Sequence, residues 1–371
     1  MILLVFVIIL SILIVVHEGG HFFMAKRLGV RVEQFALGFG KALWSRVYRG
    51  TEYRLCAIPL GGYVKMAGDE REQCKGAADE YFSKSKGHRS LIILMGPVVN
   101  YLLAYLCFVV VFMIGYVDLD ATSKAVPAMV GKVMASSPAE KAGIKEGDKI
   151  IAIDGKSMAN WGEMQEKISS SGGKSLLITM ARADKRMTVV VLPELQKTQD
   201  IFGKEHQVSR IGVQPKGAGK PEELVIRKYG FFQSFGKGAE ELWAITAKTY
   251  TALWEIVTHQ RSAKEGMTGL IGMFFIIKFA MTIGFSFLLH IIGVISASLA
   301  IFNLLPLIPL DGGHLFLIGL EKLRGRALSV KADELINKAG FALIIALALF
   351  VFYVDFERIG LIDRVLHLFR G

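Results

Sequence analysis

The chain has 371 residues, of which 52% are hydrophobic and 21% are charged, and its formal net charge is +11. It is too apolar for an ordinary soluble protein and too charged to lie wholly in lipid, so we expect part membrane and part soluble. Lys and Arg are spread over loops without an aromatic-rich basic module, which argues against nucleic acid as a partner. The three cysteines have no CxxC spacing, so we expect neither a disulfide framework nor a thiolate zinc site.

Residues 2–25 form an apolar stretch long enough to cross a bilayer and end in a zinc-binding motif. His17 and His21 are four residues apart, so a helix presents both imidazoles on one side, where they can hold one Zn²⁺. Glu18 lies beside them as a candidate base for metal-bound water. Ionisable groups at this depth cost roughly 2.5 kcal/mol or more each and are usually kept for function. The segment lacks the features of a cleaved signal peptide, and we interpret it as a retained helix.

Between the first two spans, residues 50–66 contain two β-rich stretches around Pro59 and Gly61-Gly62, which predict a β-hairpin. A free strand edge can accept an extended peptide, which matters because a helical substrate must be unwound before hydrolysis. A surface hairpin without a role in substrate binding is an equally open interpretation. Residues 67–89 are polar and charged and are expected to form a cytoplasmic loop.

Three further apolar stretches predict membrane spans, at residues 90–116, 279–302 and 339–354. Basic residues follow the first span, precede the second and lie between the third and fourth. The positive-inside rule therefore places these loops in the cytoplasm and the region after Asp118 outside.

From residue 128 to 193 the pattern changes to the short strands and helices of one compact α+β domain. The expected strands are 128–134, 149–153, 174–180 and 186–192, and the expected helices are 138–142 and 161–170. The stretch from Ser137 to Lys156 resembles a PDZ domain of the bacterial protease type, which holds extended peptide ends by strand addition. Residues 194–228 are too short and too polar to form a second copy.

Residues 194–265 are expected to form a linker and amphipathic helices. From Tyr229 to His259, aromatic residues recur at three- and four-residue steps among Lys and Glu, which suits a helix along the outer membrane interface. Packing against the neighbouring domain is the alternative. Residues 356–370 predict a shorter amphipathic tail of the same kind.

A hydrolytic zinc ion uses three protein ligands and leaves its fourth position for water, so the two histidines need a partner. Asp311 is the best candidate, because it follows an apolar segment broken by two prolines and precedes Gly312-Gly313. Broken backbone at membrane depth is tolerated where it lines a cavity. His314 is expected to pack or cap a helix rather than bind metal, and His290 to hydrogen-bond a neighbouring helix.

Four motifs together make a family resemblance specific: His-Glu-Gly-Gly-His, the segment Ile58–Met66, Gly-Pro-Val-Val-Asn at 96–100, and Asn-x-x-Pro-x-x-x-Leu-Asp-Gly-Gly at 303–313. In this order they resemble the site-2 protease family of intramembrane zinc metalloproteases, in particular its bacterial regulator-of-sigma-E protease type. The resemblance implies a polytopic α-helical membrane protein with about four transmembrane helices, a cytoplasmic-side β-hairpin and one inserted periplasmic PDZ domain.

Carried over residue by residue, the resemblance implies that His17, His21 and Asp311 bind Zn²⁺ and that Glu18 is the catalytic base. Asn303 is implied to polarise the scissile carbonyl or to hold the substrate backbone. Three further positions are candidates for substrate contact: Gly61, Gly62 and Asn100. Two departures stand out. Gram-negative members of this branch often have two tandem PDZ domains, and many relatives have Gly-Pro before the third span, where this chain has no proline in 266–272.

The expected function is an intramembrane zinc protease of the bacterial inner membrane that cuts single-span membrane proteins, such as anti-sigma factors or signal-peptide remnants, in regulated intramembrane proteolysis. The expected partners are that substrate, the bilayer, and a peptide or substrate ectodomain at the PDZ domain. The alternative is a membrane-anchored PDZ binding protein with a structural or inactive metal site. A transporter is disfavoured because no inverted repeat is visible. The expected regions are residues 1–127, 128–193, 194–265 and 266–371.

Overall fold

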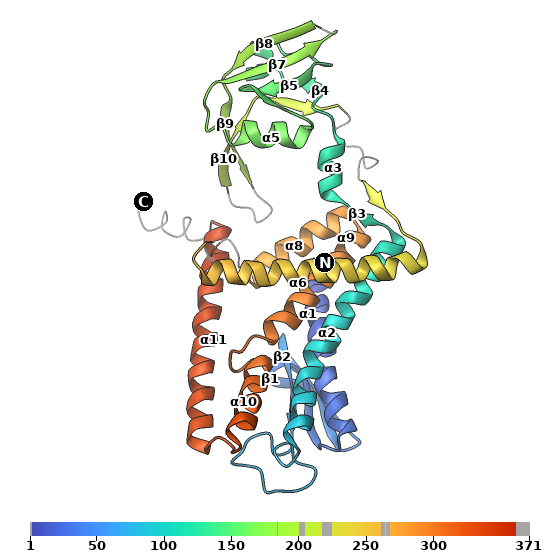
Figure 1. Ribbon diagram of the computed structural model, residues 1–371, viewed down its shortest axis with the longest axis vertical. Coiled ribbons are helices and arrows are strands. Elements are labelled where there is room, and N and C mark those ends of the chain that lie inside the picture. The colour runs from blue at the N-terminus through green and yellow to red at the C-terminus, as the bar shows by residue number, and fades with distance from the viewer. Residues whose placement is uncertain are drawn as a thin grey trace. The chain divides into compact units, whose positions relative to one another are not determined.

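The computed structural model describes residues 2–183, 185–199, 205–216, 225–260, 264 and 268–360. The chain divides into two compact units: one combines Met1–Ile114 with Tyr229–Phe356, and the other combines Gly115–Lys228 with Glu357–Gly371. The first unit is mainly helical, and the second contains most of the strands (Figure 1). In chain order, residues 115–228 of the second unit are therefore inserted between Ile114 and Tyr229 of the first.

Four helices in the described part of the chain are long and apolar enough to cross a membrane: α1 (Ile2–Arg27), α2 (Lys86–Ile114), α9 (Phe285–Asn303) and α11 (Val330–Arg358). They confirm the four predicted spans. The third begins at Phe285 rather than near residue 279, because Gly284, with a φ of +136°, separates α9 from α8 (Leu270–Ile283). At 1.5 Å per residue, α8 is about 21 Å long, which is too short to cross the hydrocarbon core alone.

The start of α8 is held by a buried carboxylate of α11. The Asp355 side chain is buried and accepts hydrogen bonds from the backbone N–H groups of Gly269, Ile271 and Gly272, at 2.9–3.2 Å. These are N–H groups that an α-helix leaves without internal partners at its first turn. This contact lies where the sequence departs from the expected Gly-Pro, although residues 265–267 of that segment lie outside the described residues.

Helix α6 (Phe231–Val257) confirms the helix predicted over residues 229–259. One face packs within the first unit: the hydroxyl groups of Tyr101 and Thr246 are 2.7 Å apart, and His290 of α9 hydrogen-bonds Glu241 at 3.0 Å. The predicted role of His290 is thereby confirmed. The opposite face is apolar and exposed, with Phe232, Trp243, Trp254 and Val257. Its position at a membrane interface stays a prediction, and the tail beyond residue 360 lies outside the described residues.

The predicted hairpin is present, but its strands and turn differ from the prediction. Strand β1 (Val32–Tyr48) pairs with β2 (Thr51–Met66), and the turn lies at Arg49-Gly50, not around Pro59. Both turn residues have positive φ, +48° and +76°, as a tight hairpin turn of the primed type requires. β1 was missed because polar residues interrupt its apolar pattern. Both strands bend, so that residues 34–37 pair with 62–65 and also with 52–55.

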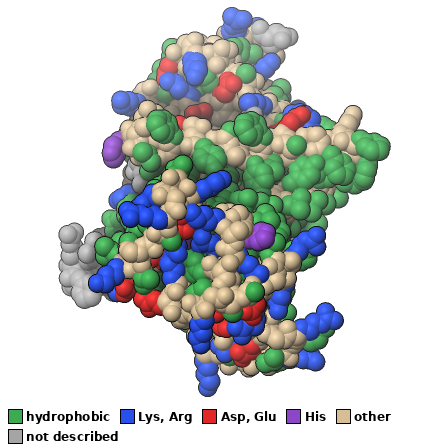
Figure 2. Space-filling model, turned by 60° about the horizontal axis from the view of Figure 1, so that its bottom comes forward, with side chains coloured by type: hydrophobic (Ala, Val, Ile, Leu, Met, Phe, Trp, Pro, Cys, Tyr) green, Lys and Arg blue, Asp and Glu red, His purple; other side chains and the backbone are tan. Residues whose placement is uncertain are grey.

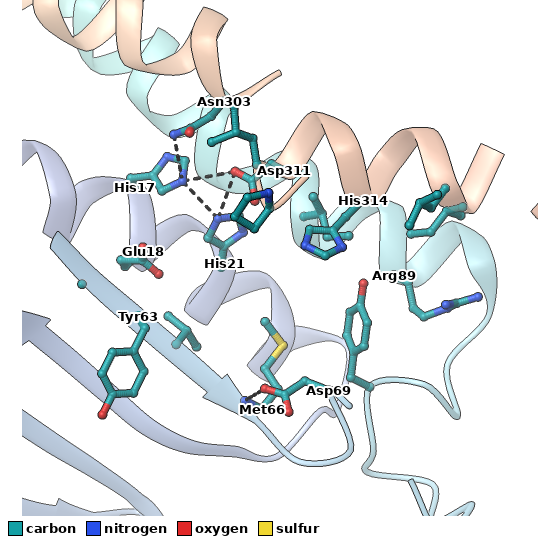
Figure 3. Close-up of a pocket in the computed structure, with 18 of the residues that line it drawn as sticks. His17, Glu18, His21, Tyr63, Met66, Asp69, Arg89, Asn303, Asp311 and His314 are labelled. Carbon is teal, nitrogen blue, oxygen red and sulfur yellow. Dashed lines mark hydrogen bonds and ion pairs between the residues drawn. The ribbon is translucent and has the colours of Figure 1, made fainter. Parts of the chain in front are cut away.

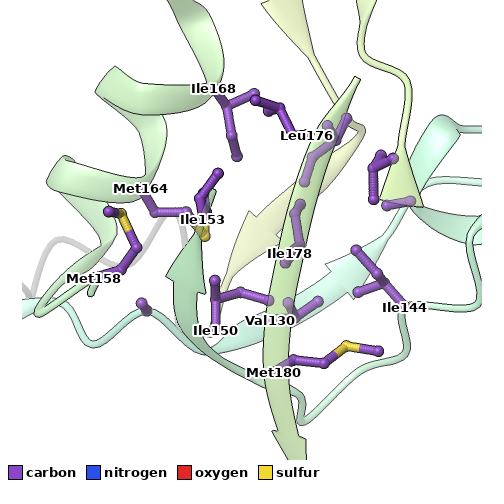
Figure 4. Packing of buried hydrophobic residues seen from close by; sticks show 14 residues of the cluster. Val130, Ile144, Ile150, Ile153, Met158, Met164, Ile168, Leu176, Ile178 and Met180 are labelled. Atoms are coloured by element: carbon purple, nitrogen blue, oxygen red, sulfur yellow. The ribbon is translucent and has the colours of Figure 1, made fainter. Parts of the chain in front are cut away.

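The second unit contains the α+β elements predicted for residues 128–193. Strands β5 (Lys149–Ile153), β7 (Leu176–Arg182) and β8 (Lys185–Val191) lie in one sheet of order β6-β5-β7-β8, where β6 is Lys156–Ser157. The other elements are α3 (Leu119–Ala125), β4 (Val130–Val133), α4 (Pro138–Lys141) and α5 (Trp161–Ser169). Ile150, Ile153, Ile178 and Met180 of the sheet lie in one core cluster with Met164 and Ile168 of α5 (Figure 4).

The compact unit continues past residue 193, where a linker was expected. Strands β9 (Glu194–Gln199) and β10 (Glu205–Arg210) form a hairpin, and β11 (Val213–Pro215) pairs with β4. Ile211 is buried in the same core as Ile150. At the base of the unit, β3 (Tyr116–Val117) pairs with β12 (Ile226–Arg227). The polar composition of this stretch hid its contribution to the core.

One ion pair with a buried carboxylate makes the stability of this unit dependent on pH. Asp148 is fully buried, and Arg182 donates two hydrogen bonds to its carboxylate, at 2.7 and 2.8 Å. Burial raises the pKa of Asp148, but Arg182 and the backbone N–H of Lys145 lower it more, to below its ordinary value of 3.8. The stabilisation is therefore present above the ordinary pKa and is lost as the pH falls through the lower pKa of the folded state.

We expect Arg182→Gln to destabilise this unit at neutral pH, because it leaves the buried carboxylate of Asp148 without its cation. The variant should also lose less stability than the wild type between pH 5 and pH 2. Thermal unfolding of the full-length protein in detergent, followed over this pH range, measures both effects. Lys167→Ala is the control, because its pair with Asp154 is exposed and is expected to contribute less than about 1 kcal/mol. Equal effects of the two substitutions would contradict the prediction.

Basic side chains gather at one end of the first unit. Lys26 and Arg27 end α1, and Lys322 and Arg324 end α10 (Asp311–Arg324). Figure 2 brings this end forward and shows many Lys and Arg side chains on it. The segments that the sequence analysis singled out for their positive charge therefore belong to one face.

Candidate metal centre

The two histidines of the first apolar helix face the same side, as their spacing predicts. His17 and His21 lie one turn apart on α1, and their Nε2 atoms are 3.3 Å from each other. Apolar residues, interrupted only by Ser11, precede them, and the helix continues to Arg27. Both imidazoles are therefore held on one continuous, largely apolar helix.

The carboxylate reaches the histidines from a distant part of the chain. Helix α9 ends at Asn303, the segment 304–310 turns back, and Asp311 is the first residue of α10. Gly312 and Gly313 make this return possible, because a β-carbon at either position would overlap the backbone of residues 304–308. The glycine pair is thus needed for the close approach that brings Asp311 to α1.

The three side chains form a triangle of metal-ligand size (Figure 3). Oδ2 of Asp311 lies 3.2 Å from Nε2 of His17 and 3.4 Å from Nε2 of His21, and the two nitrogens are 3.3 Å apart. Four ligands held about 2.0 Å from a zinc ion at tetrahedral angles stand about 3.3 Å from one another. Two nitrogens and one carboxylate oxygen at these separations fit zinc and leave a fourth position open. Within the described residues, this is the group that could hold a metal ion.

Glu18 lies next to this triangle without belonging to it. It lines the same cavity, between α1 and the backbone of β2 (Figure 3). A β-carbon at Gly62 would come within 3.2 Å of the Glu18 side chain and 2.9 Å of Ile14. The absence of a side chain at Gly62 therefore lets the strand pass directly beside the carboxylate.

Asn303 also lies at the triangle. Its Nδ2 atom is 3.4 Å from Nε2 of His17, on the side from which a metal ion would be held. Asn100 is on the opposite side of the same imidazole, with its amide 3.5 Å from Nδ1. His314 lines the cavity one turn beyond Asp311 but is not part of the ligand group.

The cavity around these residues has a volume of about 650 Å³ and is lined by α1, β2, α2, α9, α10 and α11. Away from the histidines its wall includes the buried Glu321, which pairs with Arg71 of the loop before α2 and with Arg89 of α2, the latter at 3.2 Å. These pairs tie the loop to two helices. Sequence reasoning did not find this cluster, because its members are up to 250 residues apart and share no motif.

Small residues set the distance between the two helices at the site. A β-carbon at Gly20 of α1 would overlap the backbone carbonyl of Met95, and one at Gly96 of α2 would overlap the Nε2 atom of His21. By contrast, Gly19 has no atom within 4 Å of its β-carbon position. The two glycines of the zinc motif are therefore not equivalent.

We expect Gly20→Ala to separate α1 from α2, to cost about 1–3 kcal/mol of stability, and to lower the bound zinc content. Gly19→Ala is the matched control and should keep or slightly raise stability, because alanine favours helix. Thermal unfolding and metal analysis of the purified variants compare the two. The packing argument is wrong if both behave alike.

The chain was compared with known proteins. The model of peptidase family M50 matches residues 5–347. A relative from Mesorhizobium japonicum that is named as a zinc metalloprotease is 31% identical, with 94% of this chain and 97% of the relative covered. One so named from Clostridium acetobutylicum is 32% identical, with 93% and 94% covered. The regulator of sigma-E protease RseP of Escherichia coli is 28% identical, with 95% and 98% covered.

A zinc-sized ligand triangle with an adjacent carboxylate, whose two histidines lie on a helix that is apolar enough to span a membrane, defines a membrane metallopeptidase. The chain belongs to peptidase family M50, the site-2 proteases, and is a metalloendopeptidase. The alignment with the Escherichia coli relative spans 449 residues, 78 more than the 371 of this chain. That relative therefore contains additional chain.

Proposed function

We propose that the protein is an intramembrane zinc endopeptidase that cuts the membrane segments of single-span proteins in regulated intramembrane proteolysis. Anti-sigma factors or signal-peptide remnants are the proposed substrates. The observation that carries this function is the triangle of His17, His21 and Asp311, whose three edges of 3.2–3.4 Å match a zinc tetrahedron. The name of the Escherichia coli relative supports a role in sigma-factor regulation.

In this proposal His17, His21 and Asp311 hold the zinc ion. Glu18 and Asn303 are the catalytic side chains that act on the water and the substrate. When bound, zinc supplies an acidified water and a Lewis acid. Glu18 accepts a proton from the attacking water and then gives it to the leaving amine. The Asn303 amide donates a hydrogen bond to the oxygen of the scissile carbonyl, where negative charge develops. A silent or structural metal site would not need Glu18, which is not among the ligands.

Strand β2 is proposed to hold the unwound substrate. Residues 62–65 pair only with β1 in the described register, so their other edge is available to add a strand. Gly61 and Gly62 line the cavity beside Glu18 and present backbone without side chains. An extended peptide on this edge would have its carbonyl groups near the metal centre. The substrate must unwind in this arrangement, because a helix offers no free N–H or C=O groups to the strand.

The proposed membrane orientation follows from charge. Basic residues end α1 and α10, which places the ends of these helices, and with them the metal centre, near the cytoplasmic side of the inner membrane. α2 then leads outward, so the inserted unit is proposed to lie on the periplasmic side. There it would act as a PDZ domain that binds a peptide or the trimmed ectodomain of the substrate.

The function is tested in proteoliposomes that contain the full-length protein, zinc and a labelled single-span substrate with a trimmed ectodomain. We expect two fragments whose masses place the cut inside the apolar segment of the substrate. Cleavage confined to loops outside the bilayer, or none with any substrate of this class, would refute the proposal. Metal flux into the vesicles without cleavage would favour a transporter instead.

A further inference from the structure

One face of α2 lies against both imidazoles. Residues 92, 96 and 100 are four apart, so Ile92, Gly96 and Asn100 lie in one row along the helix. Gly96 provides the room that the His21 ring needs. The residues on either side of it each approach one histidine, from the side opposite to the ligand triangle.

For His21, the hydrogen bond from α2 is present in the structure. Its Nδ1 atom donates to the backbone carbonyl of Ile92 at 2.9 Å, while its Nε2 atom faces Asp311. A ring that binds metal through Nε2 in its neutral form carries its proton on Nδ1, and an acceptor at Nδ1 fixes both tautomer and orientation. A main-chain carbonyl can do this whatever the side chain at position 92.

Among the described residues, no backbone carbonyl accepts a hydrogen bond from Nδ1 of His17. Its Nε2 atom faces the triangle, so its Nδ1–H also requires an acceptor, and the neighbouring polar group is the side-chain amide of Asn100, 3.5 Å away. Asn100 is 0% exposed, and its Oδ1 atom has no hydrogen-bond partner among the described residues. A half-turn of the amide, which preserves its shape, brings this orphaned oxygen to the Nδ1–H donor. This rotation of the Asn100 amide gives both the Oδ1 acceptor of Asn100 and the Nδ1–H donor of His17 a hydrogen-bond partner.

The backbone of Asn100 is fixed independently of its amide. Its carbonyl oxygen accepts a hydrogen bond from the buried Ser296 hydroxyl of α9, at 2.8 Å. The main chain at position 100 is therefore held between α1 and α9, and only the side chain is available to His17.

We propose that Asn100 is a positioning residue of the metal centre: its side-chain oxygen accepts the Nδ1–H of His17 and orients Nε2 toward the ion. This role rests on the proposed zinc site. The substrate contact expected for Asn100 from the family resemblance stays a separate prediction, because Asn100 also lines the cavity. Outer-shell acceptors of this kind typically change metal affinity by about 10- to 100-fold.

The test is the zinc affinity of the full-length protein in detergent, measured by competition with a chromogenic chelator, without any substrate. Asn100→Leu keeps the volume but removes the acceptor, and should weaken zinc binding by about 10- to 100-fold. Asn100→Asp restores an acceptor at the same place and should bind zinc nearly as the wild type does. Ser296→Ala removes the backbone contact alone and should leave the affinity unchanged. Thermal unfolding of each variant separates loss of fold from loss of metal.

The zinc affinity of Asp311→Asn, measured in the same assay, tests the proposed ligand set separately from the role of Asn100. If Asp311→Asn weakens binding and Asn100→Leu does not, the role of Asn100 is refuted while the metal centre stands. Equal weakening by the leucine and aspartate variants also refutes it, because the acceptor would then be irrelevant. If Asp311→Asn has no effect, the ligand set itself is wrong and the inference falls with it.

Discussion

Glu18→Gln is expected to reduce cleavage of a membrane-embedded substrate by about 10²- to 10⁴-fold, because glutamine cannot accept the proton of the attacking water. The zinc content should stay near one ion per chain, since Glu18 stands outside the ligand triangle. The shape of the side chain is kept, so the substitution fits beside Gly62 as glutamate does. Fragment formation in proteoliposomes, together with metal analysis of the same preparation, measures both quantities.

Two outcomes would count against this role. Full activity of Glu18→Gln would remove the residue from the mechanism. Loss of zinc along with activity would make Glu18 a support of the site rather than its base. Glu334→Gln is a suitable control for the same chemical change, because Glu334 is exposed and pairs only with Lys338 among the described residues.

Asp311→Asn is expected to lower zinc affinity by more than about 100-fold, beyond the range of outer-shell substitutions, because the neutral amide replaces a charged ligand. Activity at limiting zinc should fall with occupancy. The matched control is Asp333→Asn, which changes a carboxylate of the same cavity that pairs with Arg71 at 3.7 Å instead of the histidines. Its zinc affinity should equal that of the wild type.

Equilibrium competition with a chelator compares the three proteins, and added zinc distinguishes weak binding from a misfolded site. If high zinc restores activity to Asp311→Asn, the substitution acted on the affinity, as expected. Unchanged affinity in Asp311→Asn would remove the carboxylate from the ligand set.

The sequence predicted the parts of this protein whose pattern is local. Four apolar runs predicted the four long helices, and the four-residue spacing of His17 and His21 placed both rings on one side of α1. Asp311 could be chosen as the third ligand because an acid after Pro306 and Pro309 is unusual in an apolar segment. The elements from residue 130 to 191 followed equally well from alternation and turn residues.

The sequence was less informative where contacts between distant segments decide the structure. The bent pairing of β1 with both ends of β2 depends on tertiary contacts and contradicted a turn inferred from Pro59 and Gly61. The end of α8 at Gly284 was hidden in a continuous apolar run. Gly19 and Gly20 could be seen as glycines, but that Gly20 and not Gly19 has a close neighbour depends on how α1 and α2 pack.

Buried charges were the least predictable feature. Asp355 and Glu321 lie in helices far along the chain from the N–H groups and arginines that they bind. A buried carboxylate is costly without partners, so its presence indicates that a partner exists. The sequence alone does not identify that partner, because charge pairs of this kind have no fixed spacing.

The most direct test of the account is zinc K-edge X-ray absorption of the full-length protein in detergent. We predict two imidazole nitrogens, one carboxylate oxygen and one exchangeable oxygen around the ion, with one imidazole lost in His21→Ala and the carboxylate lost in Asp311→Asn. A spectrum with sulfur ligands, or with four protein ligands and no exchangeable position, would contradict the proposed catalytic centre.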